Sequence, residues 1–370
     1  MWIFNLQNLA SLLGALADAF ASALIAIYYG FLSFPTGFAY LTGALFAGIW
    51  GLSTPISYQA ESIVLVGEMG KDFRERLSII VISGVIMIIL GSLGLLDMIV
   101  NFIGTEILAG MMAGVGILLA KTGLDLIKED KIPGITALIT SILVFVLTDN
   151  LAYMIVASLF AASITYLFIK KRNKKDNEES VDELKNIDNL EKVEGSKRIS
   201  ERLIIFKPIL KSKSVWKSAL ALSALQIGAN ISYGAITSDI ANTSFSADRL
   251  TIMSGLADAI SGIFGGAPME AVIAPTAAGQ NPVGLGVIFM IIMAGVLFTG
   301  LIGKVSKLVP VNGAVGYLFV LGTLIVVPDN LPLIYSQTGS ISGIVTMVVT
   351  SLSDPFTGML SGLLSKFIGL

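Results

Sequence analysis

The sequence predicts an all-α polytopic membrane protein with about 14 transmembrane segments, arranged as two inverted repeats of seven segments each. Composition is the first reason. Of the 370 residues, 54% are hydrophobic and only 14% are charged, and the mean hydropathy is +0.84. Soluble domains carry about 25% charged residues. A soluble core could not bury this much apolar surface, so we expect the excess to face lipid.

The spacing of the apolar runs is the second reason. A bilayer span needs about 20 mostly apolar residues. The first part of the chain contains seven such runs, at 9–30, 36–50, 54–68, 77–96, 103–121, 134–148 and 151–169. The second part contains seven more, at 216–236, 250–265, 268–280, 284–303, 310–327, 341–352 and 355–369. Several runs are too short to cross a bilayer alone, which indicates broken helices.

A charged stretch separates the two groups of segments. It contains more than half of the 24 Lys and Arg residues, interleaved with acidic ones. This composition predicts a solvated linker with one amphipathic helix near 199–210. The predicted organisation is therefore a first repeat at 1–169, a linker at 170–214 and a second repeat at 215–370.

Internal similarity is the third reason. The Gly-Ile-Trp-Gly stretch at 48–51, followed by Pro55, matches Gly-Ile-Phe-Gly at 262–265, followed by Pro268. In the same order, 134–143 matches 343–352, and 147–154 matches 352–359. An odd number of segments in each half makes the second copy enter the membrane from the opposite side. Inverted repeats of this kind are typical of secondary transporters.

The third and tenth segments are the predicted site, because they are short and interrupted by Gly and Pro at matching places. We place Pro55 and Pro268 in the first turn of a helix, where the missing N–H costs little. The two helix N-termini would then offer unpaired backbone N–H groups and a partial positive charge inside the membrane.

Polar side chains on these two segments and on the eighth are predicted to bind the substrate. They are Ser57, Tyr58, Gln59, Glu61, Gln226, Asn230, Glu270 and Thr276. Burying a carboxylate in a membrane costs at least about 2–3 kcal/mol. The predicted carriers of a coupling ion are therefore acidic residues, namely Glu61, Glu270 and Asp18.

Each candidate has a structural alternative. Glu270 lies just after Pro268 and could simply stabilise a helix dipole, whereas we place Glu61 about 9 Å into its helix, too deep for capping. Gln226 and Asn230 are four residues apart and could be hydrogen-bonding partners between helices. Asp18 and Asp258 could pair with helix ends.

Enzyme chemistry is not predicted. The sequence has no His and no Cys, and it contains no phosphate-binding loop or acidic cluster with metal-ligand spacing. We therefore expect no cofactor, no metal and no nucleic-acid partner. A channel is the remaining alternative class, but inverted repeats with broken helices favour alternating access.

Beyond these patterns, the chain resembles the fourteen-segment fold shared by nucleobase permeases (xanthine/uracil and guanine/hypoxanthine) and sulfate permeases. The stretch from Val81 to Leu124 looks like their fourth and fifth segments, and Gln7-Asn8 looks like the Gln-His start of nucleobase permeases. The resemblance implies that the third and tenth segments are short strand-then-helix elements that hold the substrate.

The sequence also departs from both families. Nucleobase permeases carry carboxylates at the positions of Leu225 and of Ala274 or Pro275. Many sulfate permeases carry an Arg at Pro275 and a cytoplasmic STAS domain, which we expect to be absent here. The tenth segment, at 265–279, is slightly closer to the sulfate-permease pattern.

The leading functional hypothesis is a permease of the plasma membrane that moves a nucleobase with a coupling proton or sodium ion. The alternative is a sulfate or other anion permease, and a homodimer is one option for its assembly. Lys and Arg residues gather on the linker's side, so the positive-inside rule places the linker in the cytoplasm. The resembled families keep both termini inside, which implies the opposite orientation.

Overall fold

The computed structural model describes residues 6–128, 131–149, 151–173, 205–302, 314–335 and 341–369. These residues form an all-α protein with one two-stranded sheet in its centre. Within the described residues, five helices are long and apolar enough to cross a membrane, and several shorter apolar helices accompany them. The prediction of a polytopic all-α membrane protein is confirmed.

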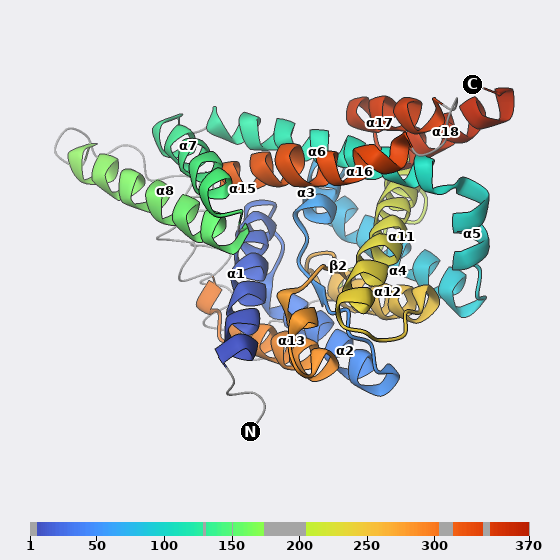
Figure 1. Ribbon diagram of the computed structural model, residues 1–370, viewed down its shortest axis with the longest axis horizontal. Helices are drawn as coiled ribbons and strands as arrows, with labels where there is room; N and C mark the ends of the chain where they lie inside the picture. The colour runs from blue at the N-terminus through green and yellow to red at the C-terminus, as the bar shows by residue number, and fades with distance from the viewer. Residues whose placement is uncertain are drawn as a thin grey trace.

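One bundle holds the first four segments of each half (Figure 1). In it, α12 packs against both α4 and α2, while α13 packs against α2 and α11 against α4. From the first half it contains α1 (Leu6–Tyr28), α2 (Ser33–Trp50), β1 (Ile56–Ser57), α3 (Ala60–Met69) and α4 (Phe73–Ser92). From the second half it contains α11 (Lys213–Ile240), α12 (Ala247–Phe264), β2 (Glu270–Ala271), η2 (Pro275–Ala278) and α13 (Pro282–Phe298).

The other bundle lies along the upper side of Figure 1. In it, α6 packs against α17 and α16, and α7 packs against α8. From the first half it contains α6 (Thr105–Ile127), α7 (Lys131–Thr148) and α8 (Leu151–Asn173). From the second half it contains α15 (Ala314–Val320), the π-helical stretch η4 (Leu321–Val326), α16 (Val327–Ile334), α17 (Ser342–Leu352) and α18 (Pro355–Ile368). We call these two sets the first bundle and the second bundle.

Every predicted segment that lies in the described residues has a counterpart among these elements. The structure adds one helix that the sequence analysis did not separate, α5 (Leu96–Ile103), which connects α4 of the first bundle to α6 of the second. It is bounded by Gly94 (φ +66°) and Gly104 (φ +93°), whose left-handed conformations suit a residue without a Cβ. A sharp turn at each end sets α5 apart from its neighbours.

Local sequence explains where the helices of the first bundle begin and end. Asp72 accepts a hydrogen bond from Glu75 N–H at 2.8 Å and caps α4. The matching helices α2 and α12 end at Gly51 (φ +67°) and Gly265 (φ +98°), both left-handed. These glycines turn the chain into the two broken segments at equivalent places in the two halves.

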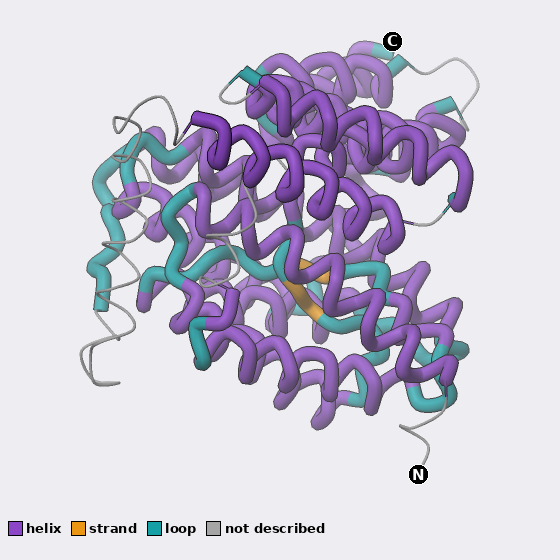
Figure 2. Tube along the Cα trace, turned by 90° about the vertical axis from the view of Figure 1, so that its left-hand side faces the viewer, coloured by secondary structure: helices purple, strands orange, loops and turns teal. Residues whose placement is uncertain are grey.

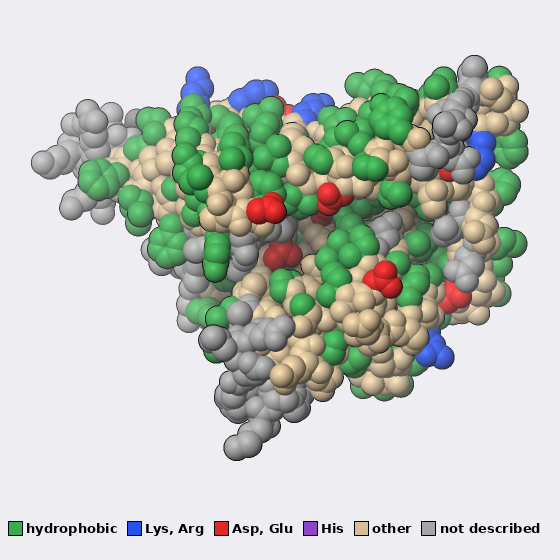
Figure 3. Space-filling model, viewed as in Figure 1, with side chains coloured by type: hydrophobic (Ala, Val, Ile, Leu, Met, Phe, Trp, Pro, Cys, Tyr) green, Lys and Arg blue, Asp and Glu red, His purple; other side chains and the backbone are tan. Residues whose placement is uncertain are grey.

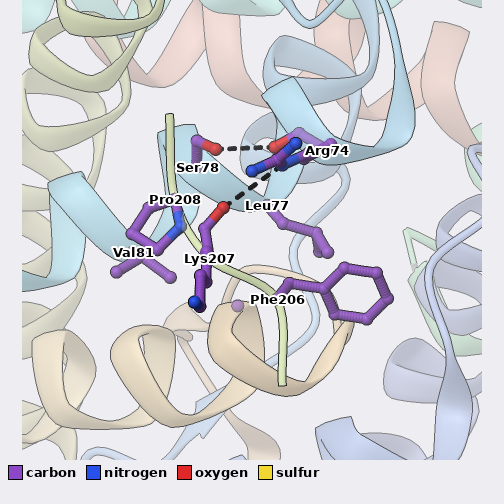
Figure 4. A pocket seen from close by; sticks show the side chains of 8 residues that line it. Arg74, Leu77, Ser78, Val81, Phe206, Lys207 and Pro208 are labelled. Atoms are coloured by element: carbon purple, nitrogen blue, oxygen red, sulfur yellow. Dashed lines mark hydrogen bonds between the residues drawn. The ribbon is translucent and has the colours of Figure 1, made fainter. Parts of the chain in front are cut away.

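The first residues of the predicted linker, 170–173, continue α8, and its last two, 213–214, begin α11, whereas the described residues between them, 205–212, are not helical. The expected helix near 199–210 is wrong for 205–210, which runs in an extended conformation across α4 and α12 (Figure 4). Phe206 N–H donates to the Ile263 carbonyl at 2.8 Å, and Ile209 N–H donates to Ser78 Oγ at 2.9 Å. Pro208 disfavours a helical conformation at Lys207, so the main chain bonds to the neighbouring helices instead. Residues 199–204 lie outside the described residues.

Replacing residues 174–197 with a Gly/Ser chain of equal length is expected to leave transport within a few-fold of wild type. These residues have a solvated composition and precede the docked segment 205–210. The measurement is solute uptake by proteoliposomes. Phe206→Ala is the contrasting variant, because the Phe206 ring packs on Phe73 at 5.5 Å. Complete loss of uptake by a folded Gly/Ser variant would contradict the prediction.

Membrane orientation can be read by cysteine labelling, because the chain has no native Cys. We expect a cysteine at Ser180, in the linker, to be protected from an impermeant maleimide in intact cells. A cysteine at Gly369 is expected to react, because the positive-inside rule puts both termini outside. The reverse pattern would give the orientation of the permease families that the sequence resembles. Labelling after permeabilisation is the control for reactivity at both positions.

Candidate functional site

Two short antiparallel strands form the centre of the candidate site. β1 pairs with β2, so that Ser57 lies opposite Glu270 and Ile56 opposite Ala271. The two strands come from the two halves of the chain and meet in the middle of the molecule (Figure 2). Their pairing satisfies backbone groups that lipid could not hydrogen-bond.

The predicted positions of the two Pro residues are wrong. Pro55 and Pro268 precede strands rather than helices, and α3 begins only at Ala60. In the tenth segment the strand is followed by a short 3-10 helix, η2. The chain forms paired strands here instead of a helix. The Pro55 carbonyl accepts a hydrogen bond from Val272 N–H at 3.2 Å, which extends the strand ladder. The strand-then-helix form implied by the family resemblance describes these segments better.

Glu61 and Glu270 are both buried in this centre, with 2% and 0% of their surfaces exposed. Ser62 Oγ donates a hydrogen bond to Glu270 Oε2. Among the described residues, Glu61 Oε2 and Glu270 Oε1 have no hydrogen-bond partner. The two carboxyl groups are close enough to interact electrostatically. The structure therefore brings together the two acids that the sequence analysis placed in separate segments.

The N-terminus of α3 is also part of this centre. Its N-cap residue, Gln59, is buried and makes no capping hydrogen bond with its side chain. Glu61 lies in the first turn of the helix, so the expectation that it lies about 9 Å along the helix is wrong. A carboxylate at this place interacts favourably with the helix dipole. One carboxyl oxygen of Glu61 nevertheless has no hydrogen-bond partner among the described residues.

Tyr40, which the sequence analysis did not identify, forms hydrogen bonds with strand β1 and with the residue that follows it. Its hydroxyl lies 2.8 Å from Ser57 Oγ and accepts a hydrogen bond from Tyr58 N–H at 3.0 Å. The rings of Tyr40 and Tyr58 pack edge to face at 5.6 Å. Tyr40 is on α2, where nothing in the sequence pattern separates it from an ordinary packing aromatic. Only the fold places it beside the strand.

A hydrogen-bond network on α11 and α12 fixes the chain just before β2. Asp258 Oδ1 accepts from Met269 N–H at 2.6 Å, and Asp258 Oδ2 accepts from Gln226 Nε2 at 2.7 Å. Gln226 Nε2 also donates to the Met269 carbonyl at 3.1 Å, and Ser254 Oγ donates to the same carbonyl at 2.9 Å. Ser83 Oγ donates to Gln226 Oε1 at 3.0 Å. Asp258 and Gln226 therefore position the residue that precedes Glu270.

A second set of bonds fixes β2 itself. Asn230 Oδ1 accepts from Ala271 N–H at 3.3 Å, and Asn230 Nδ2 donates to Thr251 Oγ1 at 3.4 Å. Thr237 Oγ1 donates to the Val272 carbonyl at 3.2 Å. The side chains of Gln226 and Asn230 are thus hydrogen-bonded both to the backbone at β2 and to side chains of α12.

The remaining predicted residues surround this centre. Thr276 is buried in η2, and its hydroxyl has no hydrogen-bond partner in the described part of the chain. Asp18, on α1, is half-buried and interacts electrostatically with Glu61. Tyr233, on α11, lies near both glutamates and near Asp329 of the second bundle. The centre therefore lies close to the second bundle.

The surface between the two bundles is hollowed and acidic. Figure 3 shows Asp and Glu side chains around the hollow, while the Lys and Arg side chains in this view lie on the outer edges. Within the described residues, no group of three or more Asp or Glu side chains is arranged to hold a metal ion. The described part of the site therefore offers buried carboxyl and hydroxyl oxygens and a helix N-terminus, and no Lys or Arg in it is paired with the glutamates.

These features define a multi-pass, all-α membrane protein with a candidate site at its paired broken segments. No family model and no curated protein matches the sequence. Solved structures with the same fold include the transmembrane domain of a cyanobacterium bicarbonate transporter, BicA. Its TM-score is 0.62 at 15% identity, over 98% of each chain.

Two structures of SLC26A9 also share the fold. One matches with a TM-score of 0.59 and 14% identity, over 98% of this chain and 65% of that one. The other, murine Slc26a9 described as an anion transporter in the inward-facing state, matches with a TM-score of 0.56 and 12% identity, over 98% of this chain and 67% of that one. The chain therefore spans about two thirds of SLC26A9. At these identities the similarity establishes the fold.

Proposed function

We propose that the protein is a secondary transporter that moves a small anion together with a proton or another monovalent cation. The observation that carries the proposal is the pair of buried glutamates at the crossing of β1 and β2, each with one carboxyl oxygen that has no partner among the described residues. Among the described residues, no Lys or Arg is paired with either oxygen, so a ligand or a proton is the natural partner of each.

The anion half of the proposal is supported by two observations. The α3 N-terminus, where Gln59 makes no side-chain cap, presents backbone N–H groups and a partial positive charge to the site. The solved structures with this fold include a bicarbonate transporter and an anion transporter. The anion alternative is thus better supported than the nucleobase hypothesis of the sequence analysis.

The proposed coupling of the anion to a proton or another cation follows from electrostatics. An anion beside Glu61 and Glu270 is repelled by both carboxylates if they are ionised. Two unit charges 4 Å apart interact with about 4 kcal/mol at an effective dielectric constant of 20. A proton or a cation that binds with the anion removes this repulsion. Alternating access between the two bundles would then carry anion and cation together.

A nucleobase remains the second candidate, on a specific observation. Two buried carboxyl oxygens and the Thr276 hydroxyl are hydrogen-bond acceptors without described partners. They could accept from the N–H groups of a planar neutral amide. Uptake of labelled bicarbonate, sulfate, chloride, uracil, xanthine and hypoxanthine by proteoliposomes, side by side, separates the two candidates. Uptake of none of these solutes would remove the support for both.

Coupling is tested in the same vesicles. We expect uptake to depend on only one of the two gradients, that of protons or that of sodium ions. Collapsing the gradient that drives uptake should lower uptake to the passive level, and collapsing the other should leave uptake unchanged. The reason is that the acids of the site have no paired Lys or Arg in the described part of the chain, so the site needs a mobile cation. An ionophore for the other cation is the matched control. Uptake that is indifferent to both gradients would identify a facilitator or an exchanger.

A further inference from the structure

An apolar groove lies between α5 and α18, away from the candidate site. It has a volume of about 330 Å³ and is lined by Met98, Ile99, Phe102, Ile103 and Leu363. Every lining side chain is apolar. Ile103 is buried and forms the floor, whereas Met98 and Phe102 are 62% and 58% exposed. In a protein surrounded by lipid, an acyl chain is the occupant that matches this apolar lining.

The ammonium group of Lys366 lies beside the groove. Lys366 Nζ lies 3.1 Å from Glu106 Oε1 and donates to the Ile103 carbonyl at 3.1 Å. The Lys366 side chain is 41% exposed, whereas that of Glu106 is only 4% exposed. An ammonium group has three N–H donors, and these contacts use two of them. The exposed side of this ion pair therefore presents one N–H donor of the Lys366 ammonium group.

Aromatic rings join the cation to the groove. Phe367, the neighbour of Lys366, packs on Phe102 with ring centroids 6.1 Å apart. Phe102 also lines the groove. The apolar groove and the charged Lys366 are thus two ends of one surface. A molecule with an acyl chain and a phosphate would contact both ends.

We propose that this surface binds a phospholipid, with an acyl chain in the groove and the phosphate at Lys366. The charge of the exposed ammonium favours an anionic headgroup over a zwitterionic one. A second copy of this chain is the competing occupant, and the experiment below tells the two apart. The inference does not depend on which solute the protein transports.

The position of the groove gives the lipid a role. α5 is the connector between the two bundles, and Figure 1 shows it at the edge of the molecule near the end of α18. The turn at Gly104 that follows α5 is tightly packed, because a Cβ there would lie 2.7 Å from Lys366 Nζ and from the Glu106 carboxyl oxygens. A lipid in the groove would therefore brace α5 against α18, and its loss would loosen the joint between the bundles.

The test uses the full-length protein, purified and delipidated in detergent. Added phosphatidylglycerol is expected to raise the apparent melting temperature at lower concentrations than phosphatidylcholine does. Leu363→Trp fills the groove and is expected to weaken the phosphatidylglycerol effect roughly tenfold. Leu364→Trp is the matched control, because Leu364 is the next residue but is 62% exposed. It should respond as wild type does.

The headgroup contact has its own variant. Lys366→Gln combined with Glu106→Gln removes the charge without leaving a buried carboxylate, and it should abolish the preference for phosphatidylglycerol over phosphatidylcholine. Equal responses of Leu363→Trp and Leu364→Trp would overturn the proposal. So would a wild-type response that tracks protein concentration and a shift to dimers, because that result identifies a second copy of the chain as the occupant.

Discussion

Glu61→Gln and Glu270→Gln are each expected to lower coupled uptake on the order of 10²-fold, the scale of removing a positioned proton-transfer group. Both substitutions keep the size of the side chain in a buried place. In Glu270→Gln the side-chain carbonyl can still accept from Ser62 Oγ, so the fold has little reason to change. What is lost is the ability to carry a negative charge and release it to a proton or cation.

The measurement is initial uptake in proteoliposomes, normalised to the reconstituted amount of each variant. Glu68→Gln is the matched control, since Glu68 lies near the end of the same helix, α3, and accepts a hydrogen bond from the Tyr29 hydroxyl at 2.6 Å. It can keep that bond as Gln, and its uptake should stay within a few-fold of wild type. Normal uptake by both buried variants would place the coupling elsewhere in the protein.

Asp258→Ala is expected to give the largest loss of stability, together with loss of transport. It removes the acceptor of Met269 N–H and of one Gln226 N–H, both of them buried. Each buried donor that is left unpaired costs about 1–3 kcal/mol. The chain before Glu270 would also lose its anchor. Apparent melting temperature in detergent and the fraction of monodisperse protein are the readouts.

A compensating pair makes this prediction specific. In Asp258→Asn, the new amide faces the Gln226 amide, donor against donor. Adding Gln226→Glu restores a donor–acceptor pair with its direction reversed. Ser83 Oγ can still donate to residue 226, and the Met269 carbonyl keeps its bond from Ser254 Oγ. We expect the double variant to be more stable than either single variant, a coupling typical of residues in direct contact. Additive losses in the double variant would show that the two side chains do not act as a pair.

The sequence by itself determined the class of the protein and the location of its broken segments. Apolar runs of bilayer length predict membrane helices, because lipid removes every alternative for the backbone except internal hydrogen bonding. Pro and Gly at matching places, Pro55 and Pro268 above all, mark the third and tenth segments, because they interrupt the internal hydrogen bonding that a membrane helix needs. The acids Glu61 and Glu270 stand out because a membrane interior makes them costly. The division of the chain into two inverted repeats remains a proposal.

Only the tertiary structure decided how the site is built. No period in the sequence reports that β1 pairs with β2, because the pairing joins residues more than 200 positions apart and depends on how the two halves of the chain pack within the first bundle. For the same reason the sequence could not show that Tyr40 holds β1 or that Ser62 bonds to Glu270. It also could not divide the polar residues into those that anchor the backbone, as Asp258 and Gln226 do, and those that keep an oxygen without a described partner. Local spacing fixes which side chains a segment carries, whereas hydrogen-bond partners are fixed by contacts between segments that are distant in the chain.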